Sequence, residues 1–166
     1  MNPVPLFLII VTLPLLLGGC GEKTKLESVN YDELEEREGI LYFKDTRYTG
    51  KAIALYENGQ KKDEDNFKDG KRDGLQLFWH QNGQKRGEIN WKNGKQNGLL
   101  VGWHENGQKG IEENYKDGKP YGLSVFWHEN GQKKRDSNYK DGKLDGLWTS
   151  WHENGKKEME GNSKDG

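Results

Sequence analysis

Four histidines are the residues of this chain with the clearest potential for metal or proton-transfer chemistry. They recur every 24 residues, at His80, His104, His128 and His152, and each is followed by Glu or Gln. Imidazole and carboxylate groups ligate zinc, and imidazole also transfers protons near neutral pH. A metal needs its donors within ~2.0–2.2 Å, whereas equivalent residues two strands apart in a sheet lie ~9.6 Å from each other. The spacing therefore predicts no metal site, and we expect neither a metal ion nor another cofactor.

Other catalytic patterns are missing from the sequence. It has no nucleophile elbow, phosphate-binding loop or zinc-ligand spacing, and none of its serines has a base at motif distance. The chain carries 26 basic and 27 acidic residues, for a net charge of -1. Nucleic-acid binding needs clustered lysine and arginine, whereas here the lysines alternate with acids beside turns. We therefore expect a protein that is not an enzyme and does not bind nucleic acid.

The histidines belong to a 24-residue unit that recurs in register. Residues 67–90, 91–114, 115–138 and 139–162 are near copies, and a degenerate copy covers residues 43–66. A fixed period of this length is typical of stacked repeat proteins, in which each unit buries its apolar face against its neighbours. The pattern predicts one domain, residues 43–166, with five repeats and a truncated end. Such a domain offers a long binding surface rather than a catalytic pocket.

Each unit reads as a β-hairpin. Leu75, Leu77 and Trp79 alternate with period two, which predicts a strand. Asn82-Gly83 predicts a type I′ turn with positive φ at both residues, and Asp69-Gly70 begins what we expect to be a longer connection. In this register Gly74 falls opposite Trp91, where a missing side chain would let the ring cross the neighbouring strand. We therefore predict an all-β fold, an elongated antiparallel sheet of stacked hairpins.

Aromatic residues must supply most of the buried area, because only 31% of the chain is hydrophobic and each ring can bury ~150–250 Å². We expect one continuous inner spine that combines two sets, Trp79, Trp103, Trp127, Trp151 and Phe67, Trp91, Tyr115, Tyr139. The opposite face would carry Phe78, Phe126 and Trp148 beside the four histidines, and we predict that this face contacts a partner. If the rings were exposed, they could instead form a platform for sugar stacking.

The N-terminal residues have the features of a secretory signal. The apolar run 3–17 is shorter than the ~20 residues that span a bilayer as a helix. Leu17-Gly18-Gly19-Cys20 resembles the bacterial lipobox, which implies a signal peptide over residues 1–19 and a lipid on Cys20. Residues 20–42 would then be the lipidated cysteine and a charged tether. This resemblance implies a lipid-anchored protein of the bacterial cell envelope, and Gly21 favours the outer membrane if the cell has two membranes.

The unit that begins Tyr139-Lys-Asp-Gly-Lys-Leu-Asp-Gly and continues to Trp151-His-Glu-Asn-Gly resembles the MORN-repeat variant of bacterial proteins. Glu38-Gly-Ile-Leu-Tyr-Phe-Lys resembles the start of such chains, so the resemblance covers residues 38–166. It implies a hairpin array that contacts proteins and, in some eukaryotic members, associates with membranes. Many bacterial relatives are labelled as antitoxin components of toxin–antitoxin systems.

The leading hypothesis is a membrane-anchored repeat lipoprotein that binds another envelope protein. One alternative is an antitoxin-like protein that neutralises a partner toxin, and another is a carbohydrate-binding surface lipoprotein. The strand edge after Asn162 could also support self-association, since an unpaired edge can add a further strand.

Overall fold

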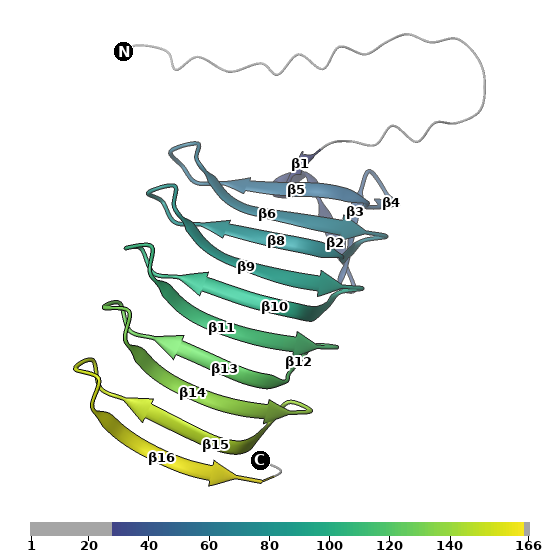
Figure 1. The fold of residues 1–166 in the computed structure, drawn as a ribbon. Helices are drawn as coiled ribbons and strands as arrows, with labels where there is room; N and C mark the ends of the chain where they lie inside the picture. The colour runs from purple at the N-terminus through teal and green to yellow at the C-terminus, as the bar shows by residue number, and fades with distance from the viewer. Residues whose placement is uncertain (1–27, 165–166) are drawn as a thin grey trace, which may run out of the picture.

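A single long sheet forms the body of the protein. The computed structural model describes residues 28–164, which contain no α-helix and are mostly strand. Figure 1 shows the hairpins stacked from the N-terminal to the C-terminal end of one twisted sheet. The strand order is β1-β5-β6-β8-β9-β10-β11-β13-β14-β15-β16, so strands that follow one another in the sequence are hydrogen-bonded neighbours along most of the sheet. The prediction of an all-β array of hairpins is confirmed.

Five hairpins share one register. They are β5 (Gly50–Leu55) with β6 (Lys61–Lys68), β8 (Gly74–Trp79) with β9 (Lys85–Lys92), β10 (Lys95–Trp103) with β11 (Lys109–Lys116), β13 (Gly122–Trp127) with β14 (Lys133–Lys140), and β15 (Lys143–Trp151) with β16 (Lys157–Ser163). Two short strands, β7 (Lys71–Arg72) and β12 (Lys119–Pro120), extend the connections between hairpins. Gly74 lies opposite Trp91 as predicted, and the same pairing recurs in the other hairpins.

The two kinds of turn are the reverse of those predicted. Asp69 and Gly70 both have positive φ, 50° and 80°, so this pair forms the tight two-residue turn. At the other end Gly83 has positive φ and Asn82 does not. There the Gly83 N–H donates to the His80 carbonyl at 2.9 Å, which makes a three-residue loop with glycine at its left-handed position. The Asn82 Oδ1 accepts from the Gln84 N–H at 2.9 Å and stabilises this loop.

The continuous aromatic spine is wrong, because the two aromatic sets lie on opposite faces. Residues paired across antiparallel strands share a face, and Trp91 pairs with Gly74 whereas Trp79 pairs with Lys85. We call the first side the tryptophan face, since it carries Trp79, Trp103, Trp127 and Trp151. The other side carries Phe67, Trp91, Tyr115 and Tyr139, and we call it the cap face.

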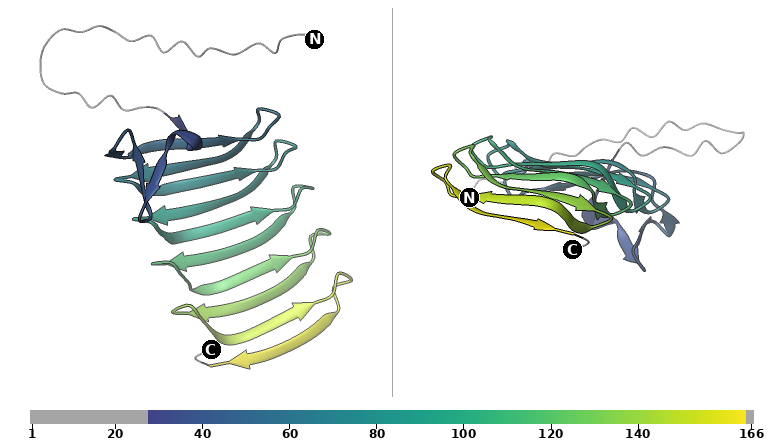
Figure 2. Two further views of the ribbon diagram at one scale, coloured as in Figure 1. Left: turned by 180° about the vertical axis from the view of Figure 1, so that it is seen from behind. Right: turned by 60° about the horizontal axis from the view of Figure 1, so that its bottom comes forward.

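The segment before the repeats is folded rather than a tether. β1 (Val29–Asn30) pairs with β5, a 3₁₀ turn covers Tyr31–Glu33, and β2 (Glu35–Arg37), β3 (Ile40–Phe43) and β4 (Thr46–Arg47) form a small second sheet. We call residues 29–47 the cap, because they lie against the back of the first hairpins in Figure 2. The tether prediction is therefore wrong for residues 29–42.

Apolar packing holds the cap in place. Val29, Tyr48, Ala52 and Phe67 form the buried cluster, with Tyr31, Leu34, Leu41 and Phe43 packed against it. A Cβ on Gly70 would lie within 2.7 Å of the Leu41 carbonyl, so this turn needs glycine for the cap to approach. The predicted signal peptide, residues 1–19, and Cys20 lie outside the described residues. No helix among residues 28–164 is long and apolar enough to cross a membrane.

Candidate binding surfaces

Lysines cover the rings on the tryptophan face. Each ammonium lies 5.1–5.6 Å from the centroid of the tryptophan ring in the following repeat, which is a cation–π distance. The pairs are Lys61 with Trp79, Lys85 with Trp103, Lys109 with Trp127 and Lys133 with Trp151. Each of these lysines also forms an ion pair with the acid three residues on, at 2.6–3.0 Å. We call these four lysine–tryptophan pairs the ladder. The ladder joins adjacent repeats and shields one side of each tryptophan ring.

Ion pairs determine the protonation state of Glu64, which lies at the N-terminal end of this face. Burial by itself would raise the pKa of Glu64, but the ion pairs with Lys51 and Lys61, both at 2.7 Å, outweigh burial and hold the pKa below its ordinary value. Glu64 is therefore charged at neutral pH and fixes both lysines on the sheet.

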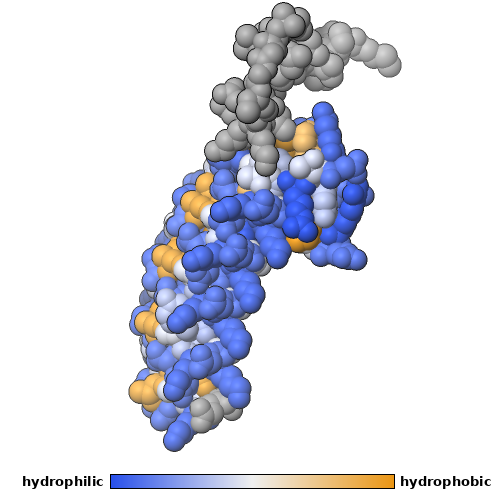
Figure 3. All heavy atoms as spheres, turned by 90° about the vertical axis from the view of Figure 1, so that its right-hand side faces the viewer, coloured by the Kyte–Doolittle hydropathy of each residue, from blue (hydrophilic) through white to orange (hydrophobic). Residues whose placement is uncertain are grey.

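The leucine that follows Gly74, and its equivalent in each of the next three repeats, is exposed. Leu75, Leu99, Leu123 and Leu147 lie on the tryptophan face, with exposed fractions of 38%, 38%, 48% and 65%. We call these four residues the leucine stripe. In Figure 3 apolar groups recur down the side of the molecule away from the cap. The sequence pattern placed Leu75 on the same face as Trp79, as the structure shows.

The predicted contact residues Phe78, Phe126 and Trp148 share the cap face. All three are half-buried. The Arg86 guanidinium lies 5.4 Å from the Phe78 ring centroid and Arg135 lies 5.9 Å from that of Trp148. Trp148 also packs against Gly161, where a Cβ would come within 2.7 Å of the indole. The structure therefore brings these residues onto one face, as expected, but covers part of each ring of Phe78 and Trp148.

Polar side chains pack between the rings of the cap face. The Trp91 Nε1–H donates to the Gln76 Oε1 at 2.8 Å, and the Ser124 hydroxyl donates to Glu113 at 2.6 Å. Burial and the neighbouring Glu113 carboxylate raise the pKa of Tyr115 to about 12. This face is therefore a mixed layer of rings and hydrogen-bonded groups, which the hydrophobic pattern alone did not predict.

Three of the histidines join neighbouring repeats. The Nε2 atoms of His80, His104 and His128 lie 3.0, 3.0 and 2.8 Å from the carbonyl oxygen of the tryptophan in the next repeat. The side chains of His80 and His128 are only 12% exposed. The structure therefore uses the rings of these three predicted contact residues between repeats. His152 belongs to the last repeat described and is exposed.

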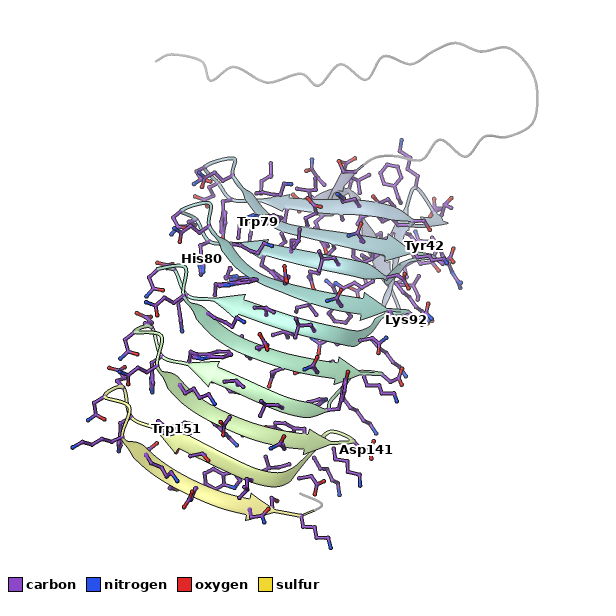
Figure 4. The ribbon with its side chains drawn as sticks, in the orientation of Figure 1. Tyr42, Trp79, His80, Lys92, Asp141 and Trp151 are labelled. Carbon is purple, nitrogen blue, oxygen red and sulfur yellow. The ribbon has the colours of Figure 1, made fainter. Side chains whose placement is uncertain are left out.

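Tyr56 takes the place of histidine in the first hairpin. Its hydroxyl donates to the Trp79 carbonyl at 2.6 Å, so it makes the same contact between repeats. Tyr56 lies 24 residues before His80, and this offset was the sequence signal for its role. Because tyrosine and histidine differ in type, the shared role could not be recognised from the residues alone. Figure 4 shows His80 at one end of the strands, beside the three-residue loops, and Lys92 and Asp141 at the other end, beside the tight turns. Within residues 28–164 no three His, Cys, Asp or Glu side chains are grouped as a metal site would require.

The fold is an open antiparallel sheet of repeated hairpins, with both faces carrying exposed side chains. The model of the MORN repeat variant matches the sequence at residues 72–93, 120–141 and 144–165. Each match spans one three-residue loop, closed at Gly83, Gly131 or Gly155, together with the strands on either side of it. A comparison with curated proteins gives no match. MORN repeats indicate a repeat scaffold or binding protein, and sheets of this kind are generally not catalytic.

Proposed function

We propose that the protein is a non-enzymatic scaffold, anchored in the bacterial envelope through a lipid on Cys20, that binds another envelope protein with its leucine stripe. The observation that carries the proposal is the exposure of a leucine at the same position of four consecutive repeats. A single exposed leucine is ordinary on a protein surface, whereas an aligned apolar row is typical of an interaction site. Burial of such surface favours association through the hydrophobic effect.

The neighbours of the leucine stripe suit a protein contact. Each leucine lies opposite an asparagine, as Leu75 lies opposite Asn90 and Leu99 opposite Asn114, so uncharged side chains separate the leucines. The Asn90 amide donates to the Leu99 carbonyl at 2.9 Å and is therefore already hydrogen-bonded. A partner could cover the stripe without removing charges from water, which is the largest cost of forming many interfaces.

The other two functions receive less support. Sugar stacking needs an open ring face, and a lysine lies over each tryptophan of the ladder. Toxin neutralisation would use the same kind of protein surface, so the location of the protein distinguishes it from an envelope scaffold.

Acyl-chain labelling with membrane fractionation tests the anchor. We expect labelled wild-type protein in the membrane fraction and unlabelled Cys20→Ala protein outside it. Unlabelled wild-type protein in the cytoplasm would contradict the anchor and favour the antitoxin function.

Site-specific photo-crosslinking in cells tests the leucine stripe. A benzophenone amino acid in place of Leu99 or Leu123 should give a discrete crosslinked band, and Leu75→Ser with Leu147→Ser should weaken it. The matched control is the same photoreactive residue in place of Leu55, which is 53% exposed but belongs to the first hairpin, outside the stripe. Equal crosslinking from Leu55 and Leu99 would reject the stripe as the contact surface.

A further inference from the structure

A pocket of about 490 Å³ lies between the cap and the cap face. Leu34 and Leu41 of the cap line one side, and Phe67 and Trp91 of the main sheet line the other. Its volume is within the ~300–1,000 Å³ of typical ligand sites, and its lining combines these apolar residues with charged side chains. The pocket lies on the opposite face from the leucine stripe, so a role for it does not depend on the function proposed above.

An arginine is held in a fixed position in this pocket. The Arg72 Cζ lies 5.3 Å from the Trp91 ring centroid and 5.7 Å from that of Phe67. Its Nε donates to Asp65 at 3.3 Å, and Asp65 is 1% exposed. Contacts with two rings and a buried carboxylate limit the rotamers of this side chain. Its terminal Nη groups make no hydrogen bond with the described residues, and guanidinium nitrogens bind carboxylates in a bidentate manner.

Two lysines extend the positive charge around the pocket. Lys71 and Lys95 are exposed and form no ion pair among residues 28–164. Their aliphatic chains pack along the edge, since a Cβ on Gly94 would lie 3.7 Å from Lys71 and a Cβ on Gly118 would lie 3.9 Å from Lys95. With Arg72 they give three cations against two acids, the lining residue Glu36 and the buried partner of Arg72, Asp65. The pocket therefore favours a ligand with negative charge.

A hydroxyl group adds hydrogen-bonding capacity to the same wall. The Tyr31 oxygen is buried and has no hydrogen-bond partner among the described residues. Buried polar groups almost always have a partner, so an unpaired hydroxyl beside a pocket indicates an unfilled contact. Tyr31 packs edge-on against Phe67 at 6.1 Å between ring centroids, which fixes the ring at the pocket wall.

We propose that this pocket binds an acidic peptide segment of a partner protein. An apolar side chain lies against Trp91 and Leu41, and the carboxylate that follows it pairs with Arg72 and the two lysines. A peptide fits better than a small acid because the lysine row continues beyond the pocket through Lys119 and Lys143. Repeats are ~9.6 Å apart. A peptide in the polyproline II conformation advances ~3.1 Å per residue with three residues per turn, so every third side chain lies on the same side and meets the next lysine.

A binding measurement with a synthetic peptide tests the site. The probe is fluorescein-labelled Phe-Glu-Ser-Thr-Glu-Ser-Thr-Glu, titrated with the purified full-length chain and followed by fluorescence polarisation. Lys71→Gln with Lys95→Gln should weaken binding at least tenfold. The matched control, Lys68→Gln with Lys92→Gln, removes the same charge from the same two turns at exposed lysines that do not line the pocket, and it should change the Kd less than threefold.

The outcomes separate the site from general charge attraction. A peptide with Gln in place of every Glu should bind at least tenfold more weakly, and Trp91→Leu should weaken the original peptide in the same direction. Equal losses in the two double variants, equal binding of the Gln peptide, or no binding at 1 mM overturns the proposal. Equal affinity for acetyl-Phe-Glu overturns the peptide class in favour of a small acid. Crosslinking at the leucine stripe is read separately, so either proposal can fail while the other stands.

Discussion

Replacement of His80 by phenylalanine tests whether hydrogen bonds between repeats stabilise the array. The imidazole Nε2 lies 3.0 Å from the Trp103 carbonyl, and the side chain is 12% exposed. Phenylalanine keeps a planar ring of similar shape, so the apolar contact largely remains. His80→Phe therefore removes the hydrogen bond to the Trp103 carbonyl, together with the longer contact of 3.8 Å between the His80 Nδ1 and Glu105.

The expected loss is set by the net value of one hydrogen bond. A neutral intramolecular hydrogen bond contributes about 0.5–1.5 kcal/mol, and the loss is larger when the abandoned acceptor stays buried. We expect the free energy of unfolding to fall by about 1–2 kcal/mol. For a domain of this size, 1 kcal/mol corresponds to a decrease in Tm of roughly 3–5 °C.

Urea denaturation followed by tryptophan fluorescence measures the effect. The control is His152→Phe, because His152 occupies the same position in the last described repeat, is exposed, and makes no hydrogen bond to a following tryptophan within residues 28–164. We expect this variant to stay within about 0.5 kcal/mol of the wild type, as is usual for surface positions. Equal destabilisation by the two substitutions would refute the role of the contact, and so would a neutral His80→Phe.

Further substitutions test other contacts. Gly98 has φ of 114°, and a Cβ there would lie 3.2 Å from a neighbouring side chain, so Gly98→Ala should lower the free energy of unfolding in urea by about 1–3 kcal/mol. A Cβ on Gly122 would have nothing within 4 Å, so Gly122→Ala should lower it only by the roughly 1–2 kcal/mol of a left-handed backbone. Lys109→Met should change stability by less than about 1 kcal/mol, because the ion pair is exposed, but should increase iodide quenching of Trp127; unchanged quenching would contradict the shielding. Burial raises the pKa of Asp65 above its ordinary 3.8, so the folded state holds this proton more tightly than the unfolded state, and its contribution is complete below pH 3.8 and lost as pH rises through the raised value. Asp65→Asn should therefore remove this part of the pH dependence measured by thermal unfolding, and an unaltered profile would contradict it.

The repeat period and the strand alternation were sufficient to predict the sheet. They also predicted that Gly74 lies opposite Trp91. This pairing is correct although the loop has three residues, because a register shift between Phe78 and Trp79 compensates for the extra residue. The separation of the aromatic sets could have been derived from the same register. Trp91 must share a face with its partner Gly74, and Gly74 is an odd number of residues from Trp79 along the strand.

The turn types and the cap could not be predicted in the same way. Both connections contain Asx-Gly, and the choice between them depends on how His80 and Gln84 pair beyond the loop. The cap has no 24-residue period, and its apolar residues are too few to show a pattern. Its packing depends on the Gly70 turn from the first repeat, which is distant in sequence. The sequence therefore did not predict that Leu34 of the cap and Arg72 of the main sheet line one pocket.

The contact between His80 and the next repeat spans 23 residues, and the same spacing recurs at His104 and His128. Removal of residues 91–114 would join Asn90 to Tyr115 and place the Trp127 carbonyl where His80 now meets that of Trp103. Recombination between repeats in the gene can therefore shorten or lengthen the sheet in whole units while every junction stays intact. The length of the sheet, and of any surface that runs along it, is then set by the number of repeats rather than by point mutations.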